Sequence, residues 1–299
     1  MTEQLSRETR RAEARSRGES PVRSISRAVA ILEQFSLDRP ELTFTEIATG
    51  VGLTKSTTHR LLAALQAEEM VEVDPRTSLY RLGLKVFRLG SIVAKTMVIA
   101  TRAEGLLVQL AEETDETAFV VVPDGDQALC IGRFEGQSHV RVLFLEVGKR
   151  QVFNCGAAPR ILLAYESPQR WEEIVARHAT AMTEHSLISR DDLRQDALEI
   201  RRRGYAVSRE DVTPHACAVG APARDASGAV VAAVSLSGIE QRFTPERLPQ
   251  LIDRIVAAGA ELSRRLGCSD AREERGAAGA AQGPRVDDGT ARTDHGDRE

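Results

Sequence analysis

The sequence predicts an α+β protein in which a helical module with a short hairpin precedes a domain built on an antiparallel sheet. Over residues 24–67 the apolar positions recur at the spacing of amphipathic helices. From residue 116 onward the period changes, and short apolar runs alternate with turns that contain Pro, Gly, Asp and Ser. This order of a helical region followed by strands and further helices is typical of the α+β class.

The stretch from Phe44 to Leu65 has the pattern of two short helices joined by a tight turn. Gly52 lies at the turn, where glycine adopts a positive φ without steric cost, and Thr54 can cap the second helix. The apolar face consists of Ile47, Ala48, Val51, Leu53, Leu61, Leu62 and Leu65. The pattern resembles a helix-turn-helix. Thr58 departs from it, because a larger aliphatic residue is usual at that inner position.

The second of these helices has the composition of a DNA-recognition helix. No acidic residue occurs in it before Glu68, and its outward side chains combine cations for phosphates with short donors and acceptors for base edges. The DNA contacts that we expect from it are Thr54, Lys55, Ser56, Thr57, His59 and Arg60. An ordinary helical hairpin with a solvated basic face is the alternative interpretation.

A further helix and a hairpin complete the predicted DNA-binding domain, residues 21–83. Apolar spacing predicts a helix over residues 24–35, which Asp38-Arg39-Pro40 should end. Residues 70–82 have a strand–turn–strand pattern, which predicts a wing. Arg76 and Arg81 would place cations near the DNA backbone, unless the hairpin has no DNA role.

After residue 83, an apolar pattern between Gly83 and Ile99 predicts a linker helix over residues 84–100. We expect an effector-binding domain over residues 101–267. Within that domain we expect helices at 101–114, 157–165, 171–178, 189–203 and 244–266, and strands at 116–122, 127–134, 140–145, 216–223 and 229–237. Residues 1–20 and 268–299 contain few large apolar side chains, and we expect them to be disordered.

Composition restricts the class of protein. The chain has 299 residues, 42% hydrophobic and 28% charged, which suits about two domains. Its net charge of −4 does not exclude DNA binding, which depends on local charge. The chain contains neither an apolar run of about 20 residues nor a signal-like N-terminus, so we expect a cytoplasmic protein that does not contact membrane. Four scattered cysteines without CxxC spacing favour reduced, buried thiols.

Several segments together resemble the IclR family of bacterial transcription regulators. They are SISRAVAILEQF at 24–35, the helix-turn-helix, YRLGLKVFRLG at 80–90, GYAVSRED at 204–211 and AVGAPARDASGAVVAAVSLSG at 218–238. The resemblance implies a winged helix-turn-helix joined by a helix to a GAF-like (profilin-like) antiparallel-sheet effector domain. It further implies a homodimer or tetramer, double-stranded operator DNA as partner, and a small polar or carboxylate metabolite as effector. Such proteins need no cofactor and act most often as repressors of metabolic or catabolic operons.

The resemblance also implies an effector site at a helix N-terminus, whose free N–H groups favour anions. The corresponding residues are Asn154, Cys155, Gly156, Ala157, Ser208, Cys217, Ala218, Ser235 and Ser237. Relatives that bind small carboxylates tend to have an aspartate where this chain has Ser208, and a cysteine where it has Ala218. Because Cys217 is shifted by one residue, it should face the other side of its strand. We therefore expect a pocket of different shape.

Three alternatives remain open at the level of sequence. His215, Cys217 and Cys155 could bind a metal ion if they lie close together. Ser235 or Cys155 could be the nucleophile of an enzyme, although no G-x-S-x-G sequence accompanies them. The chain could instead be a ligand-binding or protein-interaction module whose winged fold does not bind DNA. The regulator is the function that the sequence favours.

Overall fold

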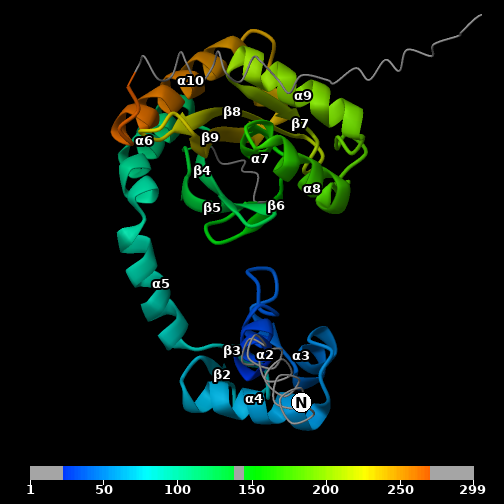
Figure 1. Cartoon of the computed structure of the whole chain (residues 1–299). Helices are drawn as coiled ribbons and strands as arrows, with labels where there is room; N and C mark the ends of the chain where they lie inside the picture. The colour runs from blue at the N-terminus through cyan, green and yellow to red at the C-terminus, as the bar shows by residue number, and fades with distance from the viewer. Residues whose placement is uncertain (1–22, 138–144, 270–299) are drawn as a thin grey trace, which may run out of the picture. The chain divides into compact units, whose positions relative to one another are not determined.

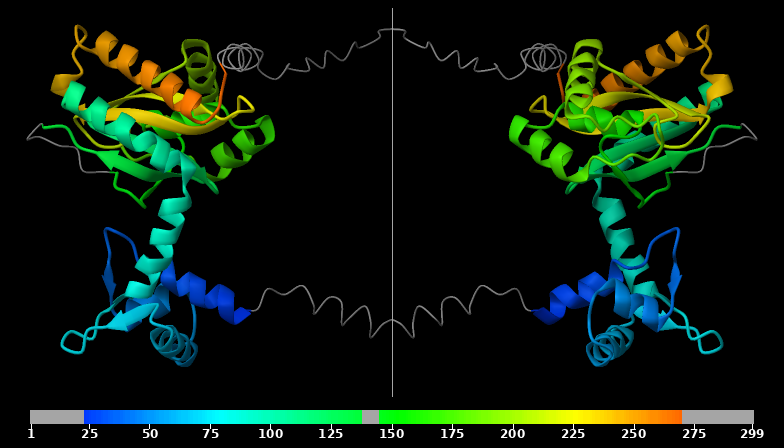
Figure 2. Two further views of the ribbon diagram at one scale, coloured as in Figure 1. Left: turned by 90° about the vertical axis from the view of Figure 1, so that its left-hand side faces the viewer. Right: turned by 90° about the vertical axis from the view of Figure 1, so that its right-hand side faces the viewer.

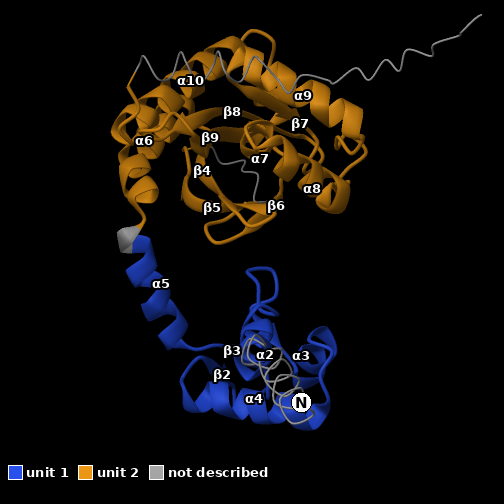
Figure 3. Cartoon of the chain, viewed as in Figure 1, with its two compact units in different colours: residues 1–96 blue, residues 97–299 orange. Residues whose placement is uncertain are grey.

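The computed structural model describes residues 23–137 and 145–269, and the chain divides into two compact units at Met97 (Figure 3). Each unit is described separately below. The predicted disordered arm at 1–20, most of the tail predicted at 268–299 and nearly all of the strand predicted at 140–145 lie outside the described residues. In the described part of the chain, no helix combines the length and hydrophobicity that a bilayer span requires.

The N-terminal unit packs three helices against a small sheet, which confirms the predicted winged helix-turn-helix fold (Figure 1). The helices are α2 (Arg23–Leu32), α3 (Phe44–Gly50) and α4 (Lys55–Ala67); the strands are β1 (Glu41–Leu42), β2 (Val71–Val73) and β3 (Tyr80–Leu82). The sheet order is β1-β3-β2, and both pairings are antiparallel. The core of the unit contains Ile31, Phe35, Leu42, Ile47, Leu62, Leu65 and Val71.

Local hydrogen bonds explain how the helix-turn-helix begins and turns. Thr43 forms a capping box with Glu46 at the start of α3, and the Thr54 side chain accepts a hydrogen bond from the backbone of Thr57 at the start of α4. Gly52 has the positive φ, 63°, that the turn requires. Thr58 is fully buried, and its hydroxyl donates to the carbonyl of Thr54 at 3.1 Å, so this polar residue is satisfied at the inner position.

The structure corrects the predicted linker helix over 84–100. Instead of one helix, α5 (Leu84–Thr96) ends before Met97, and α6 (Val98–Thr114) begins immediately after it. Met97 has extended backbone angles and precedes α6 as its N-cap residue. Residues 98–100 therefore belong to the first helix of the C-terminal unit. The sequence predicted the boundary between the two helices after residue 100, and apolar periodicity that continues across Met97 explains the shift.

The C-terminal unit is built on six antiparallel strands in the order β6-β5-β4-β9-β8-β7, as the predicted α+β fold class requires. The strands are β4 (Thr117–Asp124), β5 (Gln127–Phe134), β6 (Arg150–Val152), β7 (Ala206–Arg209), β8 (Ala216–Arg224) and β9 (Val230–Ile239). The sequence did not predict β6 and β7. Both are short edge strands whose pairing with β5 and β8 defines them, and three or four residues are too few for a clear alternating pattern.

Helices cover both faces of this sheet (Figures 1 and 2). One core lies between the sheet and α7 (Ala157–Ala164), α8 (Pro168–His178) and α9 (Arg190–Arg203), and the other between the sheet and α6 and α10 (Leu248–Arg265). Alternation along β4 assigns Phe119 to the first core and Val120 to the second. The predicted start of the last helix at Thr244 is wrong, because the Thr244 carbonyl accepts from Arg247 and Leu248 in a turn that precedes α10.

A buried carboxylate joins the end of α6 to the segment before α10. The Glu116 side chain is 2% exposed, and its Oε1 accepts from Arg242 Nε at 2.7 Å and also pairs with Arg247. Both guanidinium groups also donate to the carbonyl of Thr114. This cluster stabilises the contact between two helices that are more than a hundred residues apart in sequence.

We expect Glu116→Ala to lower the free energy of unfolding of the C-terminal unit by about 2 kcal/mol, because it leaves two arginines without their buried carboxylate. The measurement is urea unfolding followed by the fluorescence of Trp171, which is buried in that unit and is the single tryptophan of the chain. Glu113→Ala is the control, since Glu113 pairs with the exposed Arg254 and its loss should cost less than about 1 kcal/mol. Equal effects of the two substitutions would contradict the assignment.

Candidate functional site

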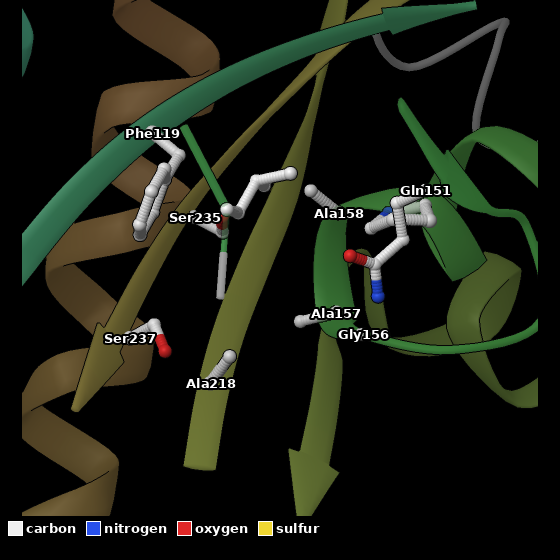
Figure 4. A pocket seen from close by; sticks show the side chains of 10 residues that line it. Phe119, Gln151, Gly156, Ala157, Ala158, Ala218, Ser235 and Ser237 are labelled. Atoms are coloured by element: carbon white, nitrogen blue, oxygen red, sulfur yellow. The ribbon is translucent and has the colours of Figure 1, made fainter. Parts of the chain in front are cut away.

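A pocket lies between the first turn of α7 and one face of the sheet (Figure 4). The empty space at this site is about 290 Å³, a figure that includes open solvent. Its lining residues are Phe119, Leu145, Gln151, Gly156, Ala157, Ala158, Pro159, Ala218, Ser235 and Ser237. The structure therefore brings together Gly156, Ala157, Ala218, Ser235 and Ser237 from the set that the sequence indicated.

The close approach of α7 to the sheet depends on a glycine in β8. Gly220 lies directly opposite Ser235 of β9, in the same cross-strand row as Phe119 of β4. A Cβ atom at Gly220 would lie 3.1 Å from Ile161 Cδ1 and 3.3 Å from Ala157 Cβ, both of α7. Because only hydrogen occupies this position, the start of α7 can lie against the strands that carry the two serines.

The side chains of Asn154 and Cys155, two residues that the resemblance assigned to the effector site, contact a neighbouring loop. Asn154 Nδ2 donates to the carbonyls of Thr180 at 2.9 Å and Leu187 at 2.8 Å, and its Oδ1 accepts from the Thr180 N–H. The thiol of Cys155 is buried and lies 3.5 Å from the same Thr180 carbonyl. Neither side chain lines the pocket, so both act on its shape and do not reach its interior.

The N-terminus of α7 already has an internal carboxylate. Gly156 has a φ of 88°, and its N–H donates to Asp211 Oδ2 at 3.0 Å. Asp211 is 3% exposed and also accepts from the hydroxyl of Ser208, so Ser208 supports this carboxylate and does not line the pocket. The N–H groups left for a ligand at this helix end are those of Ala157 and Ala158, which have no intrahelical acceptor.

Arg160 compensates the buried charge of Asp211. Its Nη1 lies 3.3 Å from Asp211, and its Nε donates to Asp196 of α9 at 2.9 Å. Burial by itself lowers the pKa of Arg160, but the hydrogen bond and charge of Asp196 and the charge of Asp211 outweigh that effect, so its pKa lies above the ordinary value. The guanidinium is therefore a permanent cation that joins α7, α9 and the loop after β7.

The two serines predicted for the effector site share one face of β9, as alternation requires. Ser235 is 5% and Ser237 3% exposed, and both line the pocket. Within the described residues, the hydroxyl of Ser237 has no hydrogen-bond partner. A buried hydroxyl without a partner costs free energy that a bound polar molecule would recover.

The structure corrects the metal hypothesis. Cys217 faces the core beside α6 and α10, whereas Cys155 lies beside the Thr180 loop and His215 is a largely exposed residue of the turn before β8. In the described part of the chain, the His and acidic ligand atoms that do lie within 4.8 Å of one another belong to Glu210, His215 and Glu240. The predicted orientation of Cys217, away from Ala218, agrees with the structure.

The cysteine thiols are also poor nucleophiles. Burial raises the pKa of Cys217 to about 11 and that of Cys130 to about 12, and it raises the pKa of Cys155. A thiol with a raised pKa carries almost no thiolate near neutral pH, and the thiolate is the reactive form. These cysteines therefore fill the core as small apolar side chains.

Helix α4 exposes the side chains that the sequence selected for DNA. Lys55, Ser56, His59 and Arg60 are exposed, whereas Thr54 and Thr57 share a hydrogen bond between their hydroxyls at 3.0 Å. The ion pairs within the described part of this unit are Arg39–Glu46, Arg76–Asp74, Arg81–Glu72 and Lys85–Glu68. Lys55 and Arg60 are not among them and remain available to phosphates.

The two arginines predicted for the wing differ in their surroundings. Arg76 is 89% exposed and lies 3.9 Å from Asp74, a loose contact in solvent. Arg81 donates through Nε and Nη2 to Glu72 of the facing strand, at 3.2 and 3.0 Å. Arg76 is thus free to reach DNA, whereas Arg81 would first have to leave its cross-strand carboxylate.

Comparison with known proteins agrees with this geometry in both units. A family model for the IclR helix-turn-helix domain matches residues 24–75, and one for the bacterial transcriptional regulator IclR C-terminal domain matches residues 92–264. The chain belongs to the IclR family of bacterial transcriptional regulators. It is 32% identical over 243 residues to the HTH-type transcriptional regulator BhcR of Paracoccus denitrificans, covering 81% of this chain and 86% of the relative.

Two further comparisons cover nearly the whole length of the related protein. The HTH-type transcriptional regulator XynR of Escherichia coli is 30% identical over 247 residues, covering 82% of this chain and 98% of the relative. A crystal structure of an IclR transcriptional regulator from Alicyclobacillus acidocaldarius has a TM-score of 0.74 and 26% identity, covering 83% of this chain and all of that one. This IclR-family protein is therefore a DNA-binding transcriptional regulator and not an enzyme, as the sequence predicted.

Gly220→Ala should push α7 away from β8 and lower the free energy of unfolding by about 2 kcal/mol, the usual cost of overpacking a core. Gly105→Ala is the matched control, because a Cβ at this α6 position meets nothing within 4 Å. Because alanine is more favourable than glycine in a helix interior, Gly105→Ala should raise the free energy of unfolding by about 0.5–1 kcal/mol. Urea unfolding monitored by Trp171 tests both, and a neutral Gly220→Ala would show that α7 does not need this close approach.

Proposed function

We propose that this IclR-family regulator is an effector-responsive repressor of a metabolic or catabolic operon and acts in the cytoplasm. The observation that carries the proposal is the pairing, in one chain, of an acid-free basic helix with a mostly apolar pocket that contains two serines, in the other unit. A related protein, AllR of Escherichia coli, is named a transcriptional repressor and is 26% identical over 267 residues. That relative supports the sign of regulation that we propose.

In this proposal α4 enters the major groove of operator DNA. Lys55 and Arg60 would pair with phosphates or guanine edges, and the exposed Ser56 and His59 would offer short polar groups to bases. Thr54 and Thr57 shape the N-terminus of the helix, where N–H groups can also receive a phosphate. The wing would contribute Arg76 to the DNA contacts. Arg81 would contribute as well once a DNA phosphate replaces Glu72 as its ion-pair partner.

The double substitution Lys55→Ala, Arg60→Ala should weaken operator binding by at least about a hundredfold and reduce the salt slope by about 2, because two cations leave the interface. Operator fragments recovered by genomic footprinting provide the DNA, and titrations at several salt concentrations provide the slope. The control is Arg190→Ala, Arg194→Ala, which removes the same charge from exposed pairs with Glu172 in the other unit. Unchanged operator affinity in the first variant would refute the role of α4.

The proposed effector site is the pocket at the N-terminus of α7. Ala157, Ala158, Ser235 and Ser237 would bind a small polar or carboxylate metabolite, with Phe119 as its apolar wall. Binding can change operator affinity only if the effector has different affinities for the DNA-competent and DNA-incompetent states. The α5–α6 break at Met97 lies on the chain between the two functional units and is the proposed hinge.

We also propose that the protein is a homo-oligomer that pairs through α5. This helix exposes large apolar side chains, with Leu84 72%, Phe87 73% and Leu89 49% exposed. Single exposed apolar residues are ordinary, but several on one short helix mark an interaction surface. A second copy of the chain is the proposed occupant, since two-fold symmetric operators require two recognition helices.

The double substitution Leu84→Glu, Phe87→Glu should convert the oligomer to a monomer. Binding to a two-fold operator should then weaken by at least about a hundredfold, because a bound subunit no longer holds a second subunit near the other half-site. Sedimentation velocity measures the first effect and operator titration the second. Leu198→Glu is the control, as Leu198 is an isolated exposed residue, 42% accessible, on α9. A double variant that sediments like the unmodified protein would exclude α5 as the interface.

A further inference from the structure

The sequence did not single out Gln151, yet its side chain is one of three polar side chains that line the pocket, with Ser235 and Ser237. It lies on β6, where its backbone pairs with Ala128 of β5. The residue is 6% exposed and lines the pocket, and its carboxamide lies beside the start of α7 (Figure 4). Its carboxamide is therefore positioned by the sheet and by burial before any ligand binds.

The orientation of this carboxamide follows from its neighbours. Nε2 donates to the backbone carbonyl of Cys155 at 3.2 Å and lies 3.8 Å from Met182 Sδ. A backbone carbonyl can only accept, so the amide nitrogen must face Cys155 and the amide oxygen must face the other way. Figure 4 shows Oε1 of Gln151 turned toward the interior of the pocket. The pocket thus has a fixed acceptor on this side.

The start of α7 offers donors to the pocket. The N–H groups of Ala157 and Ala158 begin α7 without intrahelical acceptors, and the neighbouring Gly156 N–H is already bonded to Asp211. Ser235 and Ser237 can each donate or accept. The pocket therefore has an obligate acceptor at Gln151, obligate donors at α7 and two adaptable hydroxyls on β9.

We infer that Gln151 is the specificity-determining residue of this pocket and selects effectors that carry both a hydrogen-bond donor and an acceptor. This inference rests on the proposed function, because it concerns the same effector site. Hydroxy acids and hydroxy amides have this chemistry: the carboxylate or carbonyl accepts from α7 and the hydroxyl donates to Gln151. 2-Oxo acids and dicarboxylates have acceptors alone near neutral pH, so they would place an oxygen against Oε1 in a desolvated site.

The discrimination follows from the cost of an unpaired buried group. A site built to bind a ligand hydroxyl strongly rejects the analogue that lacks it, because the protein group is then left without a partner. Swapping the hydroxyl for a keto oxygen should thus weaken binding by at least about tenfold. An apolar side chain in place of Gln151 would remove both the acceptor and this penalty, and the preference should disappear.

The test compares matched pairs of ligands on the purified full-length protein. The probes are lactate with pyruvate, 2-hydroxybutyrate with 2-oxobutyrate, and 2-hydroxyglutarate with 2-oxoglutarate. Calorimetry gives the dissociation constants, and thermal melting detects weak binding at millimolar concentration. We expect the hydroxy member to bind at least about tenfold more tightly than its oxo partner in every pair that binds.

Three variants separate specificity from folding. Gln151→Leu should reduce the preference to less than about twofold. Gln151→Glu is nearly isosteric and keeps an acceptor oxygen at this position, so it should keep the preference for the hydroxy member. Met182→Leu alters the neighbour of Nε2 without touching the pocket lining, and the preference should be unchanged. Melting temperature and operator affinity show whether each variant is folded.

Three results would overturn the inference. They are equal or tighter binding of an oxo member, a preference that persists in folded Gln151→Leu, and no binding by any probe. Operator footprinting does not depend on Gln151, so it judges the proposed regulator separately. A protein that protects its operator but prefers 2-oxo acids would retain the proposed function and lose this assignment of ligand class.

Discussion

The ion pair between Arg160 and Asp211 is the interaction on which the pocket at the start of α7 depends. Asp211 is buried and accepts the Gly156 N–H, so it fixes the residue at which α7 begins. A buried carboxylate without a cation would be costly, and Arg160 supplies that cation while also pairing with Asp196. One network therefore joins α7, α9 and the loop after β7, and the donors of the pocket are set in place by charges that lie outside it.

The two units place their polar side chains in opposite environments. Operator DNA is a highly charged polymer, and exposed side chains such as Lys55 and Arg60 suit it because counterion release favours their binding to phosphates. A small molecule offers few contacts, so its site must be desolvated and organised in advance, as Ser237 and Gln151 are. In agreement with this contrast, Lys55 and Arg60 are not in the ion pairs of the described residues of their unit, whereas the pocket lies next to a buried ionic network.

Much of the fold could be predicted because local chemistry determined it. Thr54 caps its helix, as the sequence indicated, and α9 lies close to the predicted range 189–203, between a Ser189 cap and a left-handed Gly204. β5 lies where the pattern predicted it, since alternation over eight residues is a strong signal. β6 and β7 were missed because strand partners, rather than their own few residues, make them strands. The break between α5 and α6 was predicted after residue 100 instead of at Met97, because the apolar pattern runs through it.

The sequence alone determined the family, the basic recognition helix and the shared face of Ser235 and Ser237, because caps, periodicity and strand alternation are short-range effects. Only the tertiary structure decided which residues near α7 reach the pocket. Asn154, Cys155 and Ser208 hold loops and a buried carboxylate, whereas Gln151 presents its oxygen to the interior. The physical reason is that a buried polar side chain points toward whatever partner completes its hydrogen bonds, and those partners lie far away in sequence.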